Sequence, residues 1–182
     1  RQPVGALQAR APEHVVYAGT ASKSLAPGLR LGWLVLPAYL VDDVTEAKLL
    51  TDHHGSTLDQ LTLATLISSG DYDRQVRRCR LAYRRRRDRL VAALQRHAPH
   101  VRVTGVAAGM HALLELPGGL TEEQVVAEAA HRGLAVEGLR SYHATGTGSA
   151  GSQHAPALVV GYGTPPDHAF TTAVARLCAC FR

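Results

Sequence analysis

The sequence predicts a layered fold of strands and helices, of the α/β or α+β class. Strand-like apolar runs alternate with helix-like segments along its 182 residues, as in folds where helices pack on a sheet. This length, with 46% apolar residues, suffices for the core of one domain or of one and a half. The longest nearly unbroken apolar stretch, residues 31–41, is too short to span a bilayer. We therefore expect no membrane association.

The first part of the chain predicts two strands joined by a loop. After a polar lead-in over residues 1–13, residues 15–18 predict a short buried strand, and residues 31–36 predict a second that Pro37 ends. The loop between them, residues 19–30, is rich in Gly, Ser, Thr and Pro. Because two strands are not a self-sufficient sheet, we expect both to belong to a larger, mostly parallel sheet.

Three helices are predicted next. Residues 38–50 have a helical pattern with two aspartates in the first turn. Ser56 can cap a helix that runs to about Ser69, where Gly70 can end it. Residues 71–97 predict one long helix, because apolar residues recur at spacings of three and four. This apolar stripe consists of Val76, Cys79, Tyr83, Leu90 and Leu94.

The remaining residues predict a unit of short strands and two helices. A helix over 121–131 begins with a capping-box pair, Thr121 and Gln124, and the last helix starts at Asp167. The Gly/Ser/Thr-rich stretch 141–155 predicts a loop. The predicted strands are 101–103, 111–116, 134–136 and 158–160.

Arginines crowd the predicted long helix and raise the net charge to +5. Nucleic-acid binding is one interpretation of so basic a helix. The arginines surround the helix, however, and only Tyr83 is an aromatic residue among them, so we favour a solvated helix. The arginines are Arg74, Arg77, Arg78, Arg80, Arg84, Arg85, Arg86, Arg87 and Arg89.

Neither the cysteines nor the histidines predict a metal site. Cys79, Cys178 and Cys180 match no disulfide framework and no four-ligand zinc pattern, and a reducing cytoplasm fits best. Cys178 and Cys180 lie in a helix-like apolar stretch, so we expect both to be small buried side chains. His53 and His54 are adjacent, and on a helix they would point about 100° apart. We expect no bound metal.

The loop between the first two strands contains the residues that suggest chemistry. Lys23 is one of only two lysines, and its amine can attack a carbonyl. Arg30, seven residues on, can present a bidentate fork to a phosphate, and the hydroxyls of Thr20 and Ser22 can add hydrogen bonds. Together they suit a phosphorylated aldehyde such as pyridoxal phosphate. An ordinary exposed loop lysine is the alternative.

Residues 20–33, Thr-Ala-Ser-Lys-Ser-Leu-Ala-Pro-Gly-Leu-Arg-Leu-Gly-Trp, resemble the Schiff-base lysine motif of fold-type-I pyridoxal-phosphate enzymes, the aspartate-aminotransferase superfamily. In particular, they are similar to the aminotransferase-like domain of MocR-type regulators in the GntR family, whose pattern is close to G-T-x-S-K-x-L-x-P-G-L-R-L-G-[YW]. The resemblance covers essentially the whole chain. Further matching segments are 69–74, 83–88, 109–116, 133–136 and 158–162.

The resemblance implies roles for individual residues. Lys23 would form the internal aldimine with pyridoxal phosphate, Arg30 would bind the phosphate, and Thr20 and Ser22 would assist. In this family the glycine-rich phosphate loop, the ring-stacking aromatic residue and the Asn and Asp that address the pyridine ring all precede the lysine. The sequence begins 22 residues before Lys23, so we expect it to lack them and to be inactive alone.

The resemblance also implies an α/β fold that is the C-terminal fragment of a fold-type-I PLP-dependent transferase. Residues 1–70 would be the C-terminal part of the PLP-binding large domain, residues 71–98 the long linking helix, and residues 99–182 a small C-terminal α+β domain. The family's winged helix, through which an intact parent would bind DNA, lies upstream.

Three functions stay open on this evidence. The first is the effector-sensing part of a MocR/GntR-type transcriptional regulator, a homodimer that detects a small amino acid or amine through pyridoxal phosphate on Lys23. The second is a fragment of a class I aminotransferase, which transfers an amino group from an amino acid to a 2-oxo acid. The third is a structural or dimerisation module.

Two positions bear on the choice between regulator and enzyme. Aminotransferases commonly bind the substrate carboxylate with an arginine in the strand before the last helix, and here Val159 stands at that place. Arg140, nearby in the sequence, is the candidate to receive a carboxylate instead. A partial sheet would also expose strand edges, so we expect the chain to associate through residues 15–36.

Overall fold

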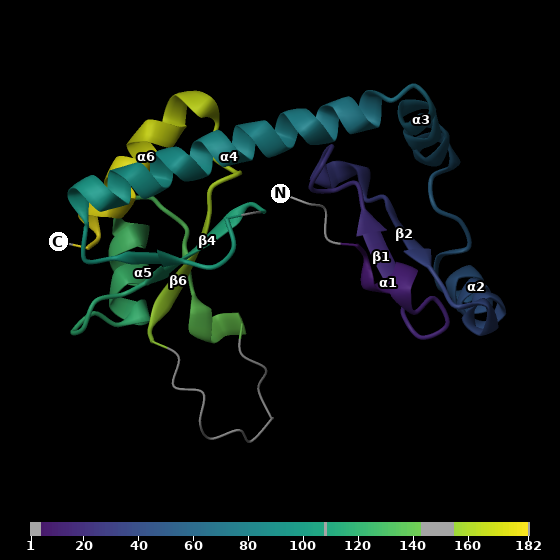
Figure 1. Ribbon diagram of the computed structural model, residues 1–182, viewed down its shortest axis with the longest axis horizontal. Helices are drawn as coiled ribbons and strands as arrows, with labels where there is room; N and C mark the ends of the chain where they lie inside the picture. Colours follow the sequence, from purple (N-terminus) through teal and green to yellow (C-terminus); the bar gives the residue numbers. More distant parts are fainter. Residues whose placement is uncertain (1–4, 108, 143–154, 182) are drawn as a thin grey trace, which may run out of the picture. The chain divides into compact units, whose positions relative to one another are not determined.

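The protein is described here from a computed structural model. The chain divides into two compact units, Arg1–Cys79 (unit 1) and Arg80–Arg182 (unit 2), and the long helix α4, Asp71–His97, contributes to both (Figure 1). Whether 1–70, 71–98 and 99–182 are the functional divisions stays a prediction. The structure describes residues 5–107, 109–142 and 155–181.

Unit 1 contains a two-stranded antiparallel sheet formed by β1, Tyr17–Thr20, and β2, Gly32–Val35. Tyr17 pairs with Val35 and Thr20 with Gly32. The two strands run antiparallel to each other because the intervening loop reverses the chain, and the larger, mostly parallel sheet around them stays a prediction. The first strand also begins two residues later than predicted and is largely exposed rather than buried.

Helices make up the rest of unit 1. Ser56 caps the second predicted helix as expected, since its hydroxyl accepts a hydrogen bond from the Asp59 amide at 3.3 Å. Gly70 follows that helix with φ +73°, a left-handed conformation that favours glycine. The helical elements before α4 are α1, Leu7–Arg10; η1, Pro27–Leu29; η2, Ala38–Leu40; α2, Val41–Asp52; and α3, Thr57–Ser68.

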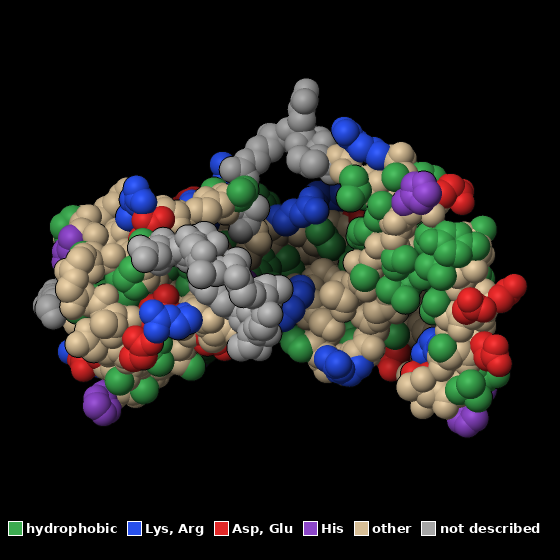
Figure 2. Space-filling view, turned by 90° about the horizontal axis from the view of Figure 1, so that it is seen from below, with side chains coloured by type: hydrophobic (Ala, Val, Ile, Leu, Met, Phe, Trp, Pro, Cys, Tyr) green, Lys and Arg blue, Asp and Glu red, His purple; other side chains and the backbone are tan. Residues whose placement is uncertain are grey.

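Unit 1 buries few of its side chains. Among its described residues only Ala21 and Pro37 are buried. Apolar side chains gather instead on its surface, at the right of the view in Figure 2. This exposed set includes Trp33, Leu34 and Val35 of β2, Leu49 and Leu50 of α2, and Leu58, Leu61 and Ile67 of α3.

Unit 2 is built on an antiparallel sheet with the strand order β3-β4-β6-β5. The segment 134–136 is not the strand that its composition predicts. The Leu134 amide donates to the Ala129 carbonyl at 2.8 Å and completes the end of α5, so pairing with β6 starts only at Glu137. The strands are β3, Arg102–Thr104; β4, His111–Glu115; β5, Glu137–Gly138; and β6, Ala157–Gly161.

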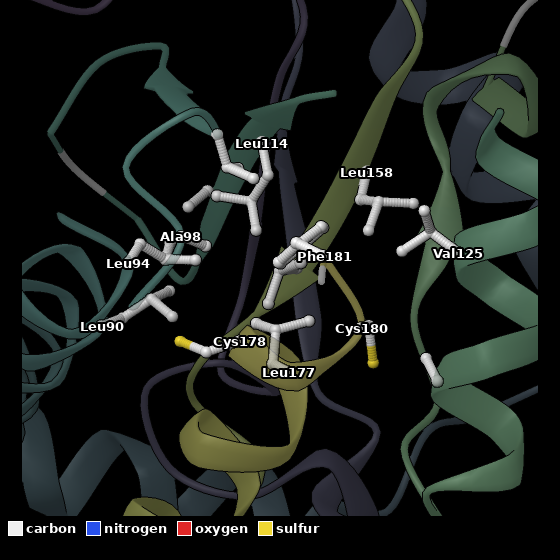
Figure 3. Packing of buried hydrophobic residues seen from close by; sticks show 14 of the residues in the cluster. Leu90, Leu94, Ala98, Leu114, Val125, Leu158, Leu177, Cys178, Cys180 and Phe181 are labelled. Carbon is white, nitrogen blue, oxygen red and sulfur yellow. The ribbon is translucent and has the colours of Figure 1, made fainter. Parts of the chain in front are cut away.

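One face of this sheet carries the core. Ala112 lies opposite Val160 and Leu114 opposite Leu158, and all four are buried. The helices α4, α5 (Glu122–His131) and α6 (Asp167–Ala179) supply the other side of the core (Figure 3). Their contributions include Leu90, Leu94, Val125, Leu177 and Cys178.

Several predictions from the sequence are confirmed in unit 2. Helix α4 has the predicted bounds, and Thr121 and Gln124 form the predicted capping box. Cys178 and Cys180 are buried, as expected. In the predicted loop 141–155, the first two residues belong to a short 3-10 helix, η3, Leu139–Tyr142, and residues 143–154 lie outside the described residues. No helix in the described ranges is long and apolar enough to cross a membrane.

The interpretation of the arginine run as a solvated surface needs one correction. The Arg86 side chain is only 14% exposed. Its guanidinium donates to the Gly163 carbonyl at 2.8 Å and to the Asp167 carboxylate at 2.6 Å, and it lies 5.2 Å from the centre of the Phe170 ring. Arg86 therefore attaches α4 to the start of α6, a contact between distant residues that spacing alone could not predict.

Candidate functional site

The candidate site is the loop that joins β1 to β2, and hydrogen bonds close its two ends. The Ala21 amide and the Thr20 hydroxyl each reach the Leu31 carbonyl at 3.0 Å. Thr20 Oγ1 also accepts a hydrogen bond from the Ser22 amide at 3.1 Å and lies 3.1 Å from Ser22 Oγ. Two of the predicted site residues, Thr20 and Ser22, are thus brought together at the base of the loop.

Lys23 lies in a tight turn above this base. The Ser24 and Leu25 amides both donate to the Ala21 carbonyl, at 3.2 and 2.9 Å. Lys23 is exposed and has no hydrogen bond or ion pair with any residue in the described ranges. Lys48 differs, because its ammonium contacts both oxygens of Asp52 at 2.9 Å. Of the two lysines, only Lys23 has an amine that is not engaged by a described carboxylate.

Arg30 ends the 3-10 helix η1 with an unusual backbone conformation. Its φ of 51° and ψ of 26° are left-handed, which costs a non-glycine residue roughly 1–2 kcal/mol. The Arg30 amide donates to the Pro27 carbonyl at 3.4 Å, and its side chain is exposed. A left-handed residue is common at the end of a helix, where it lets the chain turn.

A second set of contacts fixes the turn from the side of α4. Ser24 Oγ and the Tyr72 hydroxyl share a hydrogen bond of 3.0 Å, and the Cys79 thiol donates to the Ser24 carbonyl at 3.7 Å. Sequence reasoning missed this contact. The available signal was that Tyr72 and Cys79 are seven residues apart, and so lie on one face of the helix.

Arg140, the candidate carboxylate receptor, belongs to unit 2, whereas the other four candidates belong to unit 1. Its amide donates to Glu122 at 3.0 Å, and its guanidinium pairs with Glu123 at 3.2 Å while 75% exposed. Exposed pairs of this kind are weak, so a carboxylate ligand could replace Glu123. The role of Arg140 stays a prediction.

The donor set of the loop fits pyridoxal phosphate. The aldehyde needs a primary amine, which Lys23 presents, and the phosphate needs cationic and hydroxyl donors, which Arg30 and Ser22 present. The Thr20 hydroxyl is already hydrogen-bonded within the loop, to the Leu31 carbonyl and the Ser22 amide. Within the described residues no three His, Cys, Asp or Glu side chains are gathered as metal ligands would be.

The loop thus contains the residue types that a pyridoxal-phosphate site needs, and their roles stay a prediction. The comparisons with known proteins are specific. The chain belongs to the aminotransferase class I and II family, whose model matches residues 3–150.

The curated relatives include transcriptional regulators. The chain is 34% identical to the HTH-type transcriptional regulator YdeL of Bacillus subtilis over 137 residues, which are 74% of this chain and 30% of YdeL. It is 33% identical to the probable rhizopine catabolism regulatory protein MocR of Rhizobium meliloti over 135 residues, 73% of this chain and 27% of that protein. The chain therefore matches about 30% of the length of these relatives.

The solved structures that resemble the chain include aminotransferases. LysN, an alpha-aminoadipate aminotransferase from Thermus thermophilus, has a TM-score of 0.78 and 28% identity. The likeness covers 96% of this chain and 44% of LysN, which was crystallised with N-(5'-phosphopyridoxyl)-L-leucine. The fold predicted from the resemblance, a C-terminal portion of a fold-type-I transferase, is confirmed.

Proposed function

We propose that this chain is part of the effector-sensing domain of a MocR/GntR-type transcriptional regulator, and that Lys23 is its pyridoxal-phosphate lysine. The observation that carries the proposal is the ordered loop that presents an unpaired Lys23 amine together with Ser22 and Arg30. Similarity to HTH-type regulators over about three quarters of the chain supports the regulator, but aminotransferases match a similar share of the chain, so the choice against the enzyme rests on Val159.

Each residue of the loop has a defined task in this proposal. Pyridoxal phosphate supplies an aldehyde that combines reversibly with primary amines. Lys23 provides the amine, and Arg30 and Ser22 hold the phosphate by charge and hydrogen bonding. Thr20 keeps Ser22 in place through the contacts at the base of the loop. The effector is a small amino acid or amine, because its amino group has the same chemistry as that of Lys23.

The parent regulator would be a cytoplasmic homodimer that contacts DNA through a winged-helix domain outside this chain. In this parent, residues 1–70 would complete the cofactor-binding large domain and residues 99–182 would form the small domain. Residues 71–98 would be the long helix that links the two domains. Effector binding would change DNA affinity only if the effector favours one of two domain arrangements, as any population shift requires.

A class I aminotransferase is the second candidate, supported by the likeness to LysN. Against it, Val159 of β6 offers no charge at the position where aminotransferases commonly have an arginine for the substrate carboxylate. An activity assay on the chain joined to its natural upstream sequence would distinguish the two candidates. Transfer of an amino group from an amino acid to a 2-oxo acid supports the enzyme, and binding of the amino acid without transfer supports the regulator.

The direct test is to incubate the chain with pyridoxal phosphate, reduce it with borohydride and map the labelled peptides by mass spectrometry. We expect Lys23 to be labelled well above Lys48, because Arg30 and Ser22 can hold the phosphate near Lys23, while the exposed pair of Lys48 with Asp52 protects its amine only weakly. Lys23→Ala should remove that label, and Arg30→Ala should raise the pyridoxal-phosphate concentration needed for half-labelling about tenfold, since one charge-assisted contact is lost. Equal, weak labelling of both lysines would mean that this chain does not preorganise the site and that sensing belongs only to the intact parent. Equal labelling in the chain joined to its natural upstream sequence would contradict the proposal.

A further inference from the structure

The turn that contains Lys23 is attached to α4 by polar contacts whose purpose the proposed function does not explain. Tyr72, Gln75 and Cys79 follow one another at spacings of three and four, so they share one face of the helix. All three are half-buried. The Gln75 amide donates to the Cys79 sulfur at 3.2 Å, and the Cys79 thiol in turn donates to the Ser24 carbonyl.

Ser24, the residue after Lys23, receives contacts on both its side chain and its backbone. Its hydroxyl meets the Tyr72 hydroxyl at 3.0 Å and lies 3.4 Å from the Ala21 carbonyl. Its amide donates to that same carbonyl, and its own carbonyl accepts from Cys79. Every polar group of Ser24 is therefore in contact with a partner, while the Lys23 amine beside it has none among the described residues.

We propose that Tyr72 and Cys79 are positioning residues for Lys23, acting through Ser24. They hold the backbone next to the lysine in one conformation and leave the amine free to react. A turn that is already ordered spares a ligand the conformational entropy of ordering it. This inference rests on the proposed function, because it explains how the reactive lysine is presented.

The first test measures the order of the turn without any cofactor. Amide hydrogen exchange of residues 24 and 25 reports the two hydrogen bonds to Ala21. Tyr72→Phe removes only the hydroxyl, and we expect exchange at these amides to rise roughly 2- to 12-fold, the range for loss of one hydrogen bond. Tyr39→Phe is the matched control, because Tyr39 is 68% exposed and has no hydrogen-bond partner among the described residues.

The second test measures the reactivity of Lys23, with Lys48 as an internal reference in the same sample. We expect Tyr72→Phe to lower the ratio of Lys23 to Lys48 labelling by pyridoxal phosphate by a similar factor of roughly 2- to 12-fold, and Ser24→Ala to have the same effect. The double variant should be no worse than Ser24→Ala alone, since Ser24→Ala already removes the contact with Tyr72 as well as the one with the Ala21 carbonyl. Ser24→Thr keeps a hydroxyl and should restore most of the ratio.

The outcomes separate the two proposals. Equal labelling of Lys23 and Lys48 in the chain joined to its natural upstream sequence overturns the proposed function, and the positioning role falls with it. Equal labelling in the unaltered chain alone overturns the positioning role, because the turn then presents no preferred amine. Selective labelling of Lys23 that is the same in the Tyr72→Phe and Tyr39→Phe variants overturns the positioning role alone. A rise in exchange throughout unit 1, rather than at residues 24 and 25, also overturns it, because Tyr72 would then serve general stability only.

Discussion

At the scale of single residues, the side chains that hold unit 2 together are polar as well as apolar. Glu122 is buried, and its carboxylate accepts hydrogen bonds from the amides of Arg140 and Ala157, both at 3.0 Å. A Cβ at Gly138 would lie 2.3 Å from that carboxylate, so any larger residue there would displace the Glu122 side chain. The sequence shows an acidic residue in the first turn of a helix, and only the fold shows that this residue connects three segments.

Arg86 and Asp167 give the stability of unit 2 a defined pH dependence. The hydrogen bond from Arg86, together with its charge, lowers the pKa of Asp167 in the folded state. A carboxyl with a lowered pKa contributes stability above its unfolded pKa, about 3.9, and loses the contribution as the pH falls through its folded pKa. We therefore expect Asp167→Asn to destabilise unit 2 at pH 7, and the difference from the unaltered chain to shrink below about pH 4.

Urea unfolding followed by circular dichroism at about pH 7 and about pH 3, on either side of the unfolded pKa, measures this difference. Asp88→Asn is the control, since Asp88 is an exposed residue of α4 that has no ion pair with a described residue. A loss of stability in Asp167→Asn that is the same at both pH values would show that the ionised pair with Arg86 is not its cause.

At the scale of elements, local signals located the helices better than the strands. The start of helix α4 and its approximate end at His97 were predicted correctly, because the apolar stripe and the flanking residues Gly70 and Pro99 agree. The strand before α5 was predicted correctly in its start at His111, yet the strand after α5 was misplaced by three residues. A helix contains its own hydrogen-bond partners, whereas a strand exists only where another strand meets it.

The capping box of α5 is visible in the sequence and also stabilises the folded state of unit 2. The Thr121 hydroxyl accepts from the Gln124 amide at 3.2 Å, and the Gln124 side chain accepts from the Thr121 amide at 3.0 Å. We expect Thr121→Ala to lower the free energy of unfolding of unit 2 by about 1 kcal/mol, as measured by urea unfolding. Thr121→Ser, which keeps the oxygen, should recover most of it. If both variants unfold alike, the cap has no measurable role.

At the scale of the whole molecule, the two units differ in how far they bury their apolar side chains. Among the residues that the structure describes, unit 2 has a core of seventeen buried residues, while unit 1 exposes apolar residues on β2, α2 and α3. Soluble proteins rarely leave so many apolar side chains in contact with water unless another surface covers them. The chain is thus expected to associate through unit 1, with residues 15–36 as the contact.

Size-exclusion chromatography with light scattering over a range of concentrations measures this association. Leu34 of β2 is 53% exposed, and we expect Leu34→Asp to weaken the association about tenfold, corresponding to about 1.4 kcal/mol of lost apolar contact. Leu81→Asp is the matched control, because Leu81 is 57% exposed on α4 and lies outside the predicted contact. A monomer at every concentration would show that residues 15–36 form no interface.

The sequence by itself determined the chemistry of the candidate site and the type of most elements. Lys23, Arg30 and the hydroxyls lie within eleven consecutive residues, so their proximity along the chain needed no fold to reveal it. The helix caps and the stripe of α4 are equally local. Only the tertiary structure decided the antiparallel pairing of β1 with β2, the burial of Arg86 and Glu122, and the contact of Tyr72 and Cys79 with Ser24. Each of these joins residues far apart in sequence, and such contacts depend on how the elements pack rather than on any local pattern.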